Sequence, residues 1–263
     1  MIALALLTAS ACCHAVWNLL MKTVSTKGAA FVWLCGLITL PLSIALLFRP
    51  TSAPWWPALV SMALHTLYAV TLQKAYAAAD FGIVYPVSRG SAPVLVTLAS
   101  VASSWRVYAG AALALVGVLR MDPPRRNQPL ARGVVLGLLV AACTAAYTLW
   151  DAYAIASLHV DLLAYLAVGN VAQVLVLSVL ARGHRAVLGE WRRAIPIAIL
   201  TPASYGLVLL ALSFASVSTV AVGRTLNVVL GALLGFFVLR ERVTRTRLAG
   251  LATVVAGVVL VST

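Results

Sequence analysis

The chain has 263 residues, of which 63% are hydrophobic and 10% are charged, and its mean hydropathy is +1.03. This composition excludes a water-soluble domain and predicts a membrane protein. A net charge of +13 would suggest a nucleic-acid partner in a soluble protein. Here the excess lies in short connections between apolar runs, so we expect a lipid bilayer around the chain and no nucleic acid.

Apolar runs follow one another along the whole chain, and each is long enough to cross about 30 Å of hydrocarbon as an α-helix. The first run lacks a basic n-region and a cleavage motif, so we interpret it as a mature helix rather than a signal peptide. The predicted fold is an all-α membrane protein with ten transmembrane helices. Their expected ranges are 2–21, 30–48, 56–74, 81–103, 105–120, 132–155, 160–181, 192–212, 215–239 and 246–262.

One polar connection, the linker 122–130, divides the chain into an N-terminal five-helix repeat (1–121) and a C-terminal five-helix repeat (131–263). Because five is odd, the two repeats are expected to be inverted relative to each other. Three sequence matches in the same order indicate the repeat. They pair Cys13–Asn18 with Cys143–Thr148, Tyr85–Arg89 with Ala221–Arg224, and Ala109–Gly117 with Ala249–Gly257.

The basic residues are divided unequally between the two sets of connections. Arg89 and Arg224 lie inside spans, and Arg49 and Arg106 lie in connections that follow even-numbered spans. The remainder of the 19 lysines and arginines follow odd-numbered spans. The positive-inside rule then places both termini outside.

The first span carries a stripe of polar and aromatic side chains at spacings of three and four residues, among them His14, Trp17 and Asn18. The sixth span repeats this stripe with Tyr147 and Asp151. Residues at this spacing share one face of a helix. Lipid does not favour such a face, so we expect both stripes to line a cavity for a small amphiphilic solute.

Two arginines fall near the middle of their spans, Arg89 in the fourth and Arg224 in the ninth. A charge in hydrocarbon costs at least a few kcal/mol, so it normally faces a partner or a watery cavity. We expect both guanidinium groups to bind a carboxylate-like or phosphate-like group of a substrate, because their planar fork matches oxyanions. The alternative is structural: they bond carbonyls freed by prolines, or pair with Asp151.

Other spans offer further polar groups to the same cavity. Tyr68 of the third span, Tyr85 of the fourth and Tyr205 of the eighth are expected to bind substrate. Asn227 is expected to do so as well, because it follows Arg224 by one turn on the same face. For Asn227 an interhelical hydrogen bond is an equal alternative. Protons are a candidate coupling ion, through His14, His65 or Asp151.

No metal, disulfide or cofactor is expected, because the cysteines lie in apolar spans without C-x-x-C spacing. They are Cys12, Cys13, Cys35 and Cys143. Small-xxx-small patterns favour packing within a monomer over a dimer, so a monomer or weak homodimer is expected. An excess of arginine over lysine indicates a bacterial source and therefore the bacterial inner membrane.

Three segments resemble the EamA-type branch of the drug/metabolite transporter superfamily. They are His14–Lys22, Ala75–Gly90 with Tyr85 inside it, and Leu239–Arg242 before the last span. The resemblance covers essentially the whole chain. It implies ten helices in two inverted repeats, transport of amino acids, other metabolites or drugs, often outward, and cytoplasmic termini. The last implication conflicts with the distribution of basic residues, so both orientations stay open. The chain departs from the family at Ser103–Arg106, where a Gly-Glu pair is common.

The functional prediction is a secondary transporter, expected to be an exporter, of a small anionic or zwitterionic metabolite such as an amino acid or organic acid. Alternating access around a midplane cavity would move it. The alternatives are an exporter of cationic drugs, a membrane-embedded enzyme and an accessory lipid-handling protein. Six acidic residues scattered over the connections do not form a catalytic cluster, so we do not expect an enzyme.

Overall fold

The computed structural model describes residues 1–21, 24, 28–101, 104–121, 130–180, 184–239 and 244–262. Residues 122–129 of the predicted linker lie outside the described residues, as do Lys22, Ser103 and residues 240–242 of the sequence motifs. Within the described ranges all regular structure is helical. The helices are α1 (Ile2–Met21), α2 (Ala29–Leu47), α3 (Trp56–Ala78), α4 (Phe81–Ala99), α5 (Trp105–Met121), α6 (Leu130–Ala156), α7 (Leu162–Leu180), α8 (His184–Val187), the 3₁₀ turn η1 (Leu188–Glu190), α9 (Trp191–Ala211), α10 (Val217–Gly223), α11 (Leu226–Leu239) and α12 (Arg245–Ser262).

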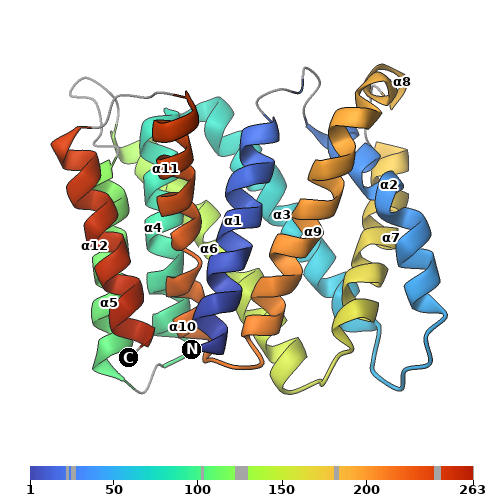
Figure 1. The fold of residues 1–263 in the computed structure, drawn as a ribbon, viewed down its shortest axis with the longest axis horizontal. Coiled ribbons are helices and arrows are strands. Elements are labelled where there is room, and N and C mark those ends of the chain that lie inside the picture. The colour runs from blue at the N-terminus through green and yellow to red at the C-terminus, as the bar shows by residue number, and fades with distance from the viewer. Residues whose placement is uncertain are drawn as a thin grey trace.

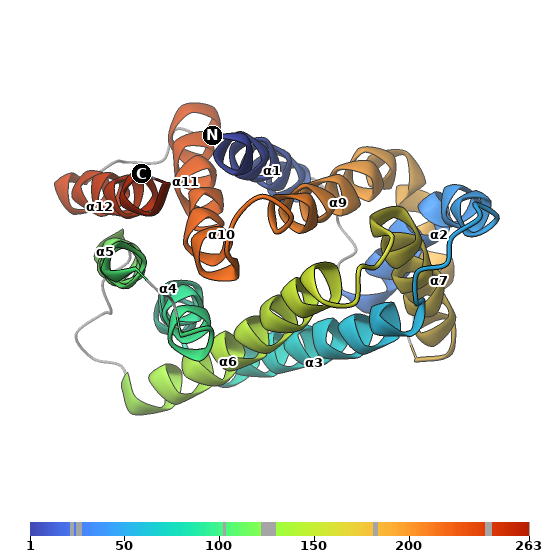
Figure 2. The same cartoon turned by 90° about the horizontal axis from the view of Figure 1, so that it is seen from below.

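The long helices run side by side between two opposite faces of the molecule (Figure 1). Both chain termini lie at one face, which we call the terminal side. The opposite face, which we call the basic side, holds the end of α1 and the beginnings of α4 and α6. Viewed from below, α5 and α12 lie at one end of the bundle and α2 and α7 at the other (Figure 2). Between them, α1, α4, α6 and the α10–α11 pair surround the middle of the molecule.

Seven helical segments in the described ranges are long and apolar enough to cross a membrane, so the chain is a multi-pass membrane protein. They are Ile2–Met21, Ala29–Leu47, Leu130–Ala156, Leu162–Leu180, Leu188–Ala211, Val217–Val238 and Arg245–Ser262. The remaining long helices, α3, α4 and α5, run beside these segments (Figure 1). Two of them contribute polar side chains to the interior, Ser61 from α3 and Arg89 from α4.

The predicted span 215–239 corresponds to the membrane-length segment Val217–Val238, but this segment is not one continuous helix. It consists of α10 and α11, which are separated at Arg224 and Thr225. There the backbone N–H groups of Thr225, Asn227 and Val228 bond carbonyls three residues earlier instead of four. This tightening is typical of a 3₁₀ turn, which inside a long helix often marks a functional position. The break places Arg224 where the two short helices meet.

Helices α5 and α12 pack through glycines at two levels. A Cβ atom on Gly110 would lie 2.8 Å from the carbonyl oxygen of Gly257, and one on Gly117 would lie 2.8 Å from that of Gly250. These distances are too short for any other residue, so the two backbones approach each other as closely as small residues allow. The contact fixes one end of the bundle.

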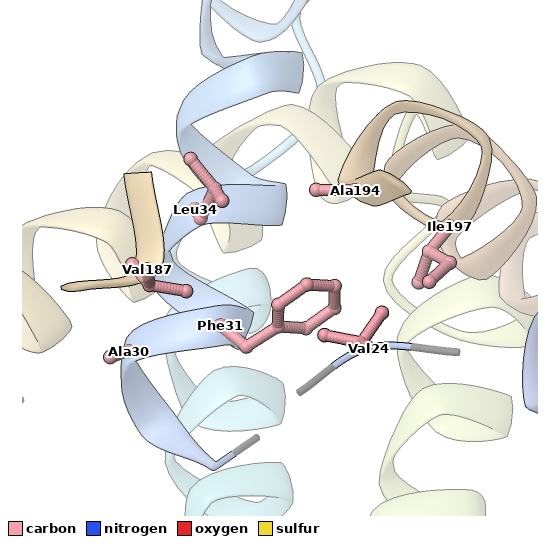
Figure 3. Close-up of a cluster of buried hydrophobic side chains, with 7 residues drawn as sticks. All are labelled: Val24, Ala30, Phe31, Leu34, Val187, Ala194 and Ile197. Atoms are coloured by element: carbon pink, nitrogen blue, oxygen red, sulfur yellow. The ribbon is translucent and has the colours of Figure 1, made fainter. Parts of the chain in front are cut away.

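An apolar cluster packs α2 and α9 together near the basic side (Figure 3). In this cluster Phe31 and Leu34 of α2 pack with Ala194 and Ile197 of α9. The side chains of Phe31 and Leu34 are buried. Trp17, Leu20 and Met21 at the end of α1 pack against it. We call the seven buried residues of this set the basic-side cluster: Val24, Ala30, Phe31, Leu34, Val187, Ala194 and Ile197.

Candidate functional site

A cavity of about 440 Å³ lies between α1, α4, α6 and the α10–α11 pair. Apolar and small residues form much of its wall, and no acidic side chain of the described residues lines it. Its size suits a metabolite, and its mixed wall is typical of a ligand site. The polar residues that line it are His14, Asn18, Tyr85, Ser88, Arg89, Thr144, Thr148, Arg224, Thr225 and Asn227.

Arg89 reaches the cavity from α4, two turns after the helix begins. Asp80 caps this helix by accepting a hydrogen bond of 2.7 Å from the Gly82 N–H. The guanidinium carbon of Arg89 lies 5.8 Å from the centroid of the Tyr85 ring, near the outer limit of a cation–π contact. No described residue accepts a hydrogen bond from this guanidinium group. Its side chain therefore lines the cavity without a hydrogen-bond acceptor among the described residues.

The backbone around Arg89 is also irregular, because α4 contains Pro86 and Pro93. Proline has no N–H, so the carbonyl oxygens four residues earlier, at Gly82 and Arg89, lose their usual helical donors. Ser88 meanwhile donates to the Tyr85 carbonyl at 3.0 Å. Helix α4 continues through both prolines, and these carbonyl groups remain as polar backbone groups near the cavity.

Arg224 reaches the same cavity from the break between α10 and α11. It donates to the Tyr147 hydroxyl at 3.1 Å and to the Thr148 hydroxyl at 3.2 Å, both on α6. Its guanidinium carbon lies 5.5 Å from the Tyr147 ring centroid. These neutral partners hold the group in place without cancelling its charge.

The two arginines thus share one cavity, as the sequence analysis expected, and neither pairs with an acid among the described residues. Where a buried charge in a membrane protein has no counter-ion, a ligand or water must supply the compensating interactions. The cavity is therefore electropositive, and its chemistry favours an oxyanion over a cation.

Asp151 does not pair with either arginine, which removes one of the structural alternatives. It is 2% exposed and accepts three hydrogen bonds from hydroxyl groups on three other helices. Ser61 and Tyr165 donate to Oδ1, each at 2.7 Å, and Tyr205 donates to Oδ2 at 2.6 Å. We call these four residues the Asp151 cluster.

His65 connects the Asp151 cluster with Tyr147. Its Nδ1 lies 2.9 Å from the Ser61 carbonyl oxygen, which can only accept, so Nδ1 carries the hydrogen. The His65 ring stacks on the Tyr147 ring at a centroid distance of 4.0 Å. A chain of contacts therefore runs from Arg224 through Tyr147, His65 and Ser61 to Asp151.

The terminal side of the cavity is closed by packing. Val96 of α4 and Ala221 of α10 line the cavity and also form a buried cluster with Ala145 of α6. Beyond them, the hydroxyls of Ser100 and Ser218 are 2.5 Å apart. Helix α4 packs against α10 at this level but makes only marginal contact with α11. The cavity extends from Arg224 towards the basic side, where α11 contributes Gly231 and Gly235.

The structure separates the eleven sequence-predicted site residues into two groups. Those that line the cavity are His14, Asn18, Tyr85, Arg89, Arg224 and Asn227. The others do not line it. Trp17 packs against the basic-side cluster, and Tyr68 contacts the Tyr147 ring edge-on at 5.5 Å. Tyr147 and Asp151 belong to the chain of contacts described above, and Tyr205 belongs to the Asp151 cluster. Whether any of them binds a substrate stays a prediction.

Sequence reasoning missed Ser88, Thr225 and the glycines of α11 as lining residues. Ser88 is adjacent to Arg89, and Thr225 to Arg224, so proximity to each arginine was a usable signal. The glycines were interpreted only as helix-packing positions. A Cβ on Gly231 would meet nothing within 4 Å, because this glycine faces the cavity.

Together, the apolar helices, the broken helix and the cavity with its mixed wall define a multi-pass α-helical membrane protein with a solute-sized site between its helices. The sequence profile of the EamA-like transporter family matches residues 131–263. The chain belongs to this family and is a membrane transporter. This confirms the resemblance seen in the sequence motifs.

Solved structures show the same fold. A chain described as "Crystal structure of protein" is similar over 98% of this chain and 95% of its own, with 16% sequence identity and a TM-score of 0.71. At this identity the likeness establishes the fold alone. None of the curated proteins matches the chain in sequence.

Proposed function

We propose that the protein is a secondary transporter of a small anionic or zwitterionic metabolite, such as an amino acid or organic acid, which binds between Arg89 and Arg224. The observation that carries the proposal is the pairing of two guanidinium groups in one cavity whose described wall contains no acid. The direction of transport and the bacterial inner membrane stay predictions of the sequence.

The difference in hydrogen bonding between the two arginines supports this proposal. Arg224 is fixed by two hydroxyl groups, whereas Arg89 has all its donors available. One carboxylate can accept a bidentate pair of hydrogen bonds from Arg89 and interact with the charge of Arg224. His14, Asn18 and Asn227 then provide neutral polar groups for the rest of the solute.

The proposed architecture is ten transmembrane helices in two inverted repeats, 1–121 and 131–263, joined by residues 122–130. The match of the family profile to residues 131–263 supports the boundary of the second repeat. The glycine contacts support the inversion. In sequence Gly110 matches Gly250 and Gly117 matches Gly257, whereas in space Gly110 meets Gly257 and Gly117 meets Gly250. A two-fold axis relating the halves produces this exchange of partners.

Alternating access follows from this arrangement in the proposal. The structure's closed terminal side, with Val96 against Ala221, would open as the basic side closes. Both arginines stay at the middle in either state because they lie near the centre of α4 and at the α10–α11 break. The bound solute would therefore become accessible from the opposite side of the membrane while it is still in contact with the guanidinium groups.

Binding of defined solutes to purified protein tests the proposal. We expect glutamate, succinate or phosphate to raise the thermal unfolding temperature, and the cation tetraphenylphosphonium to leave it unchanged. Arg89→Ala and Arg224→Ala should each remove the shift. Arg192→Ala is the matched control, because Arg192 lies over the Trp191 ring at the beginning of α9 and does not line the cavity. A response to the cation alone, or equal anion responses in both variants, would contradict anion binding at this site.

A further inference from the structure

The Asp151 cluster has a property that packing alone does not require. Its carboxyl group is buried and accepts three hydroxyl hydrogen bonds, but no arginine, lysine or histidine of the described residues lies within ion-pair distance. Removing a carboxylate from water without a cation costs several kcal/mol even where hydrogen bonds compensate in part. In a membrane protein, such a group is functional by default.

The repeat provides an internal comparison for this cluster. The match of Cys13–Asn18 with Cys143–Thr148 places Met21 at the position equivalent to Asp151. Met21 packs against the basic-side cluster, in which α2 and α9 meet through Phe31, Leu34, Ala194 and Ile197 (Figure 3). An apolar junction is sufficient to hold the helices there, so the carboxyl group at Asp151 serves a purpose other than packing.

The cluster lies where the terminal side is closed. Asp151 is near the end of α6, and its donors come from the first half of α3, the beginning of α7 and the second half of α9. Opening this side by separating α6 from α9 would break the bond from Tyr205 to Oδ2. The carboxylate would lose one of the three donors that favour its charged form. Water admitted at the open side would at the same time give the group access to protons.

The cluster is also linked to the anion site. Tyr147 receives a hydrogen bond from Arg224 and stacks on His65, which bonds Ser61 beside the carboxyl group. The other titratable groups near Asp151 are Tyr165 of α7 and Tyr205 of α9. Arg89 and Arg224 lie on the cavity side of α6. A change at Arg224 can therefore reach Asp151 through contiguous side chains.

We propose that Asp151 is the proton-binding site that couples this transporter to the proton gradient. It is a carboxylate when the terminal side is closed and a carboxylic acid when that side is open, and it takes its proton from the water admitted there. The hydroxyls of Ser61, Tyr165 and Tyr205 keep their protons in both states. The coupling rests on the transport function proposed above, but the proton site itself can be measured without any solute.

Infrared difference spectroscopy of the protein in lipid vesicles, titrated with acid, tests the site directly. We expect a C=O stretching band of a protonated carboxyl group that is lost in Asp151→Asn. Asp161→Asn is the control, because Asp161 caps α7 on the same side by accepting from the Ala164 N–H at 2.8 Å. Tyr205→Phe keeps the carboxyl group, so the band should remain in this variant. A titrating spectrum that Asp151→Asn leaves unchanged would overturn the proposal.

Disulfide formation between Ser100→Cys and Ser218→Cys, in a background without native cysteines, reports closure of the terminal side. Asp151→Asn mimics the protonated group, so we expect the disulfide to form about tenfold more slowly in this variant, as loss of hydrogen bonds to a charged acceptor implies. Asp161→Asn should leave the rate unchanged. An equal rate in all three proteins would show that Asp151 does not control closure. If the infrared and disulfide results are as expected but no anion binds, the proposed solute is refuted and the proton site is not.

Discussion

Arg224 donates a hydrogen bond to the hydroxyl of Tyr147 at 3.1 Å, and its guanidinium carbon lies 5.5 Å from the centroid of the same ring. One side chain of α6 therefore fixes both the direction and the depth of an arginine on the broken helix. Arg89, the other arginine of the cavity, has no corresponding donor interaction with the described chain. The two cationic groups of the cavity are thus held unequally, which has consequences that can be measured.

Tyr147→Phe should weaken anion binding while preserving the fold. The phenyl ring keeps its stack on His65, and only the hydroxyl that orients Arg224 is lost. A hydrogen bond to a charged group is worth about 1.5–3 kcal/mol, and Thr148 still holds the guanidinium group, so we expect affinity to fall by about five- to tenfold. Isothermal titration of the best-binding anion measures it. Tyr153→Phe, an exposed change on the same helix, should bind normally; equal loss in both would point to a general effect on α6.

Gly117→Ala should destabilise the protein. The added Cβ would lie 2.8 Å from the Gly250 carbonyl oxygen and 2.6 Å from a methyl group of Val254, so α5 and α12 would have to separate. Overpacking of this kind costs about 1–3 kcal/mol. Thermal unfolding in detergent measures the change. Gly169→Ala, where the new Cβ meets nothing within 4 Å, is the control and should be neutral or slightly stabilising. A Gly117→Ala protein as stable as the control would mean that the glycine contact is looser than described.

The double variant Ser100→Cys/Ser218→Cys should stop transport when oxidised. The two side-chain oxygens are 2.5 Å apart, which brings the β-carbons within reach of a disulfide. Locking α4 to α10 would keep the terminal side closed, so solute flux should disappear on oxidation and return with a reducing agent. Oxidised protein that transports at the normal rate would exclude opening between these helices.

The sequence predicted the convergence of Arg89 and Arg224 because the expected repeat would place them at equivalent depths, and both line one cavity. Polar periodicity likewise identified His14 and Asn18 as cavity residues. The break at Arg224 was not predictable in the same way: Gly223 is its only local signal, and the break depends on bonds to α6, which is distant in sequence.

The Asp151 cluster shows a second limit. A stripe on one helix indicates which residues share a face, so Asp151 was grouped with Tyr147 and expected to line the cavity. Its three donors come from α3, α7 and α9, and no spacing within the chain reveals that they meet. Asp151 follows Thr144 by seven residues, so it lies on the same face of α6 but about 10 Å further along the helix, beyond the residues that line the cavity.

Solute flux into proteoliposomes, measured with the anion that binds best to the purified protein, is the decisive test of the paired-arginine site. We expect uptake by the unmodified protein and by Arg192→Ala. Uptake should be lost in Arg89→Ala and in Arg224→Ala, although both variants fold and enter the vesicles. Unchanged anion flux in these two variants would contradict a site built on the paired arginines.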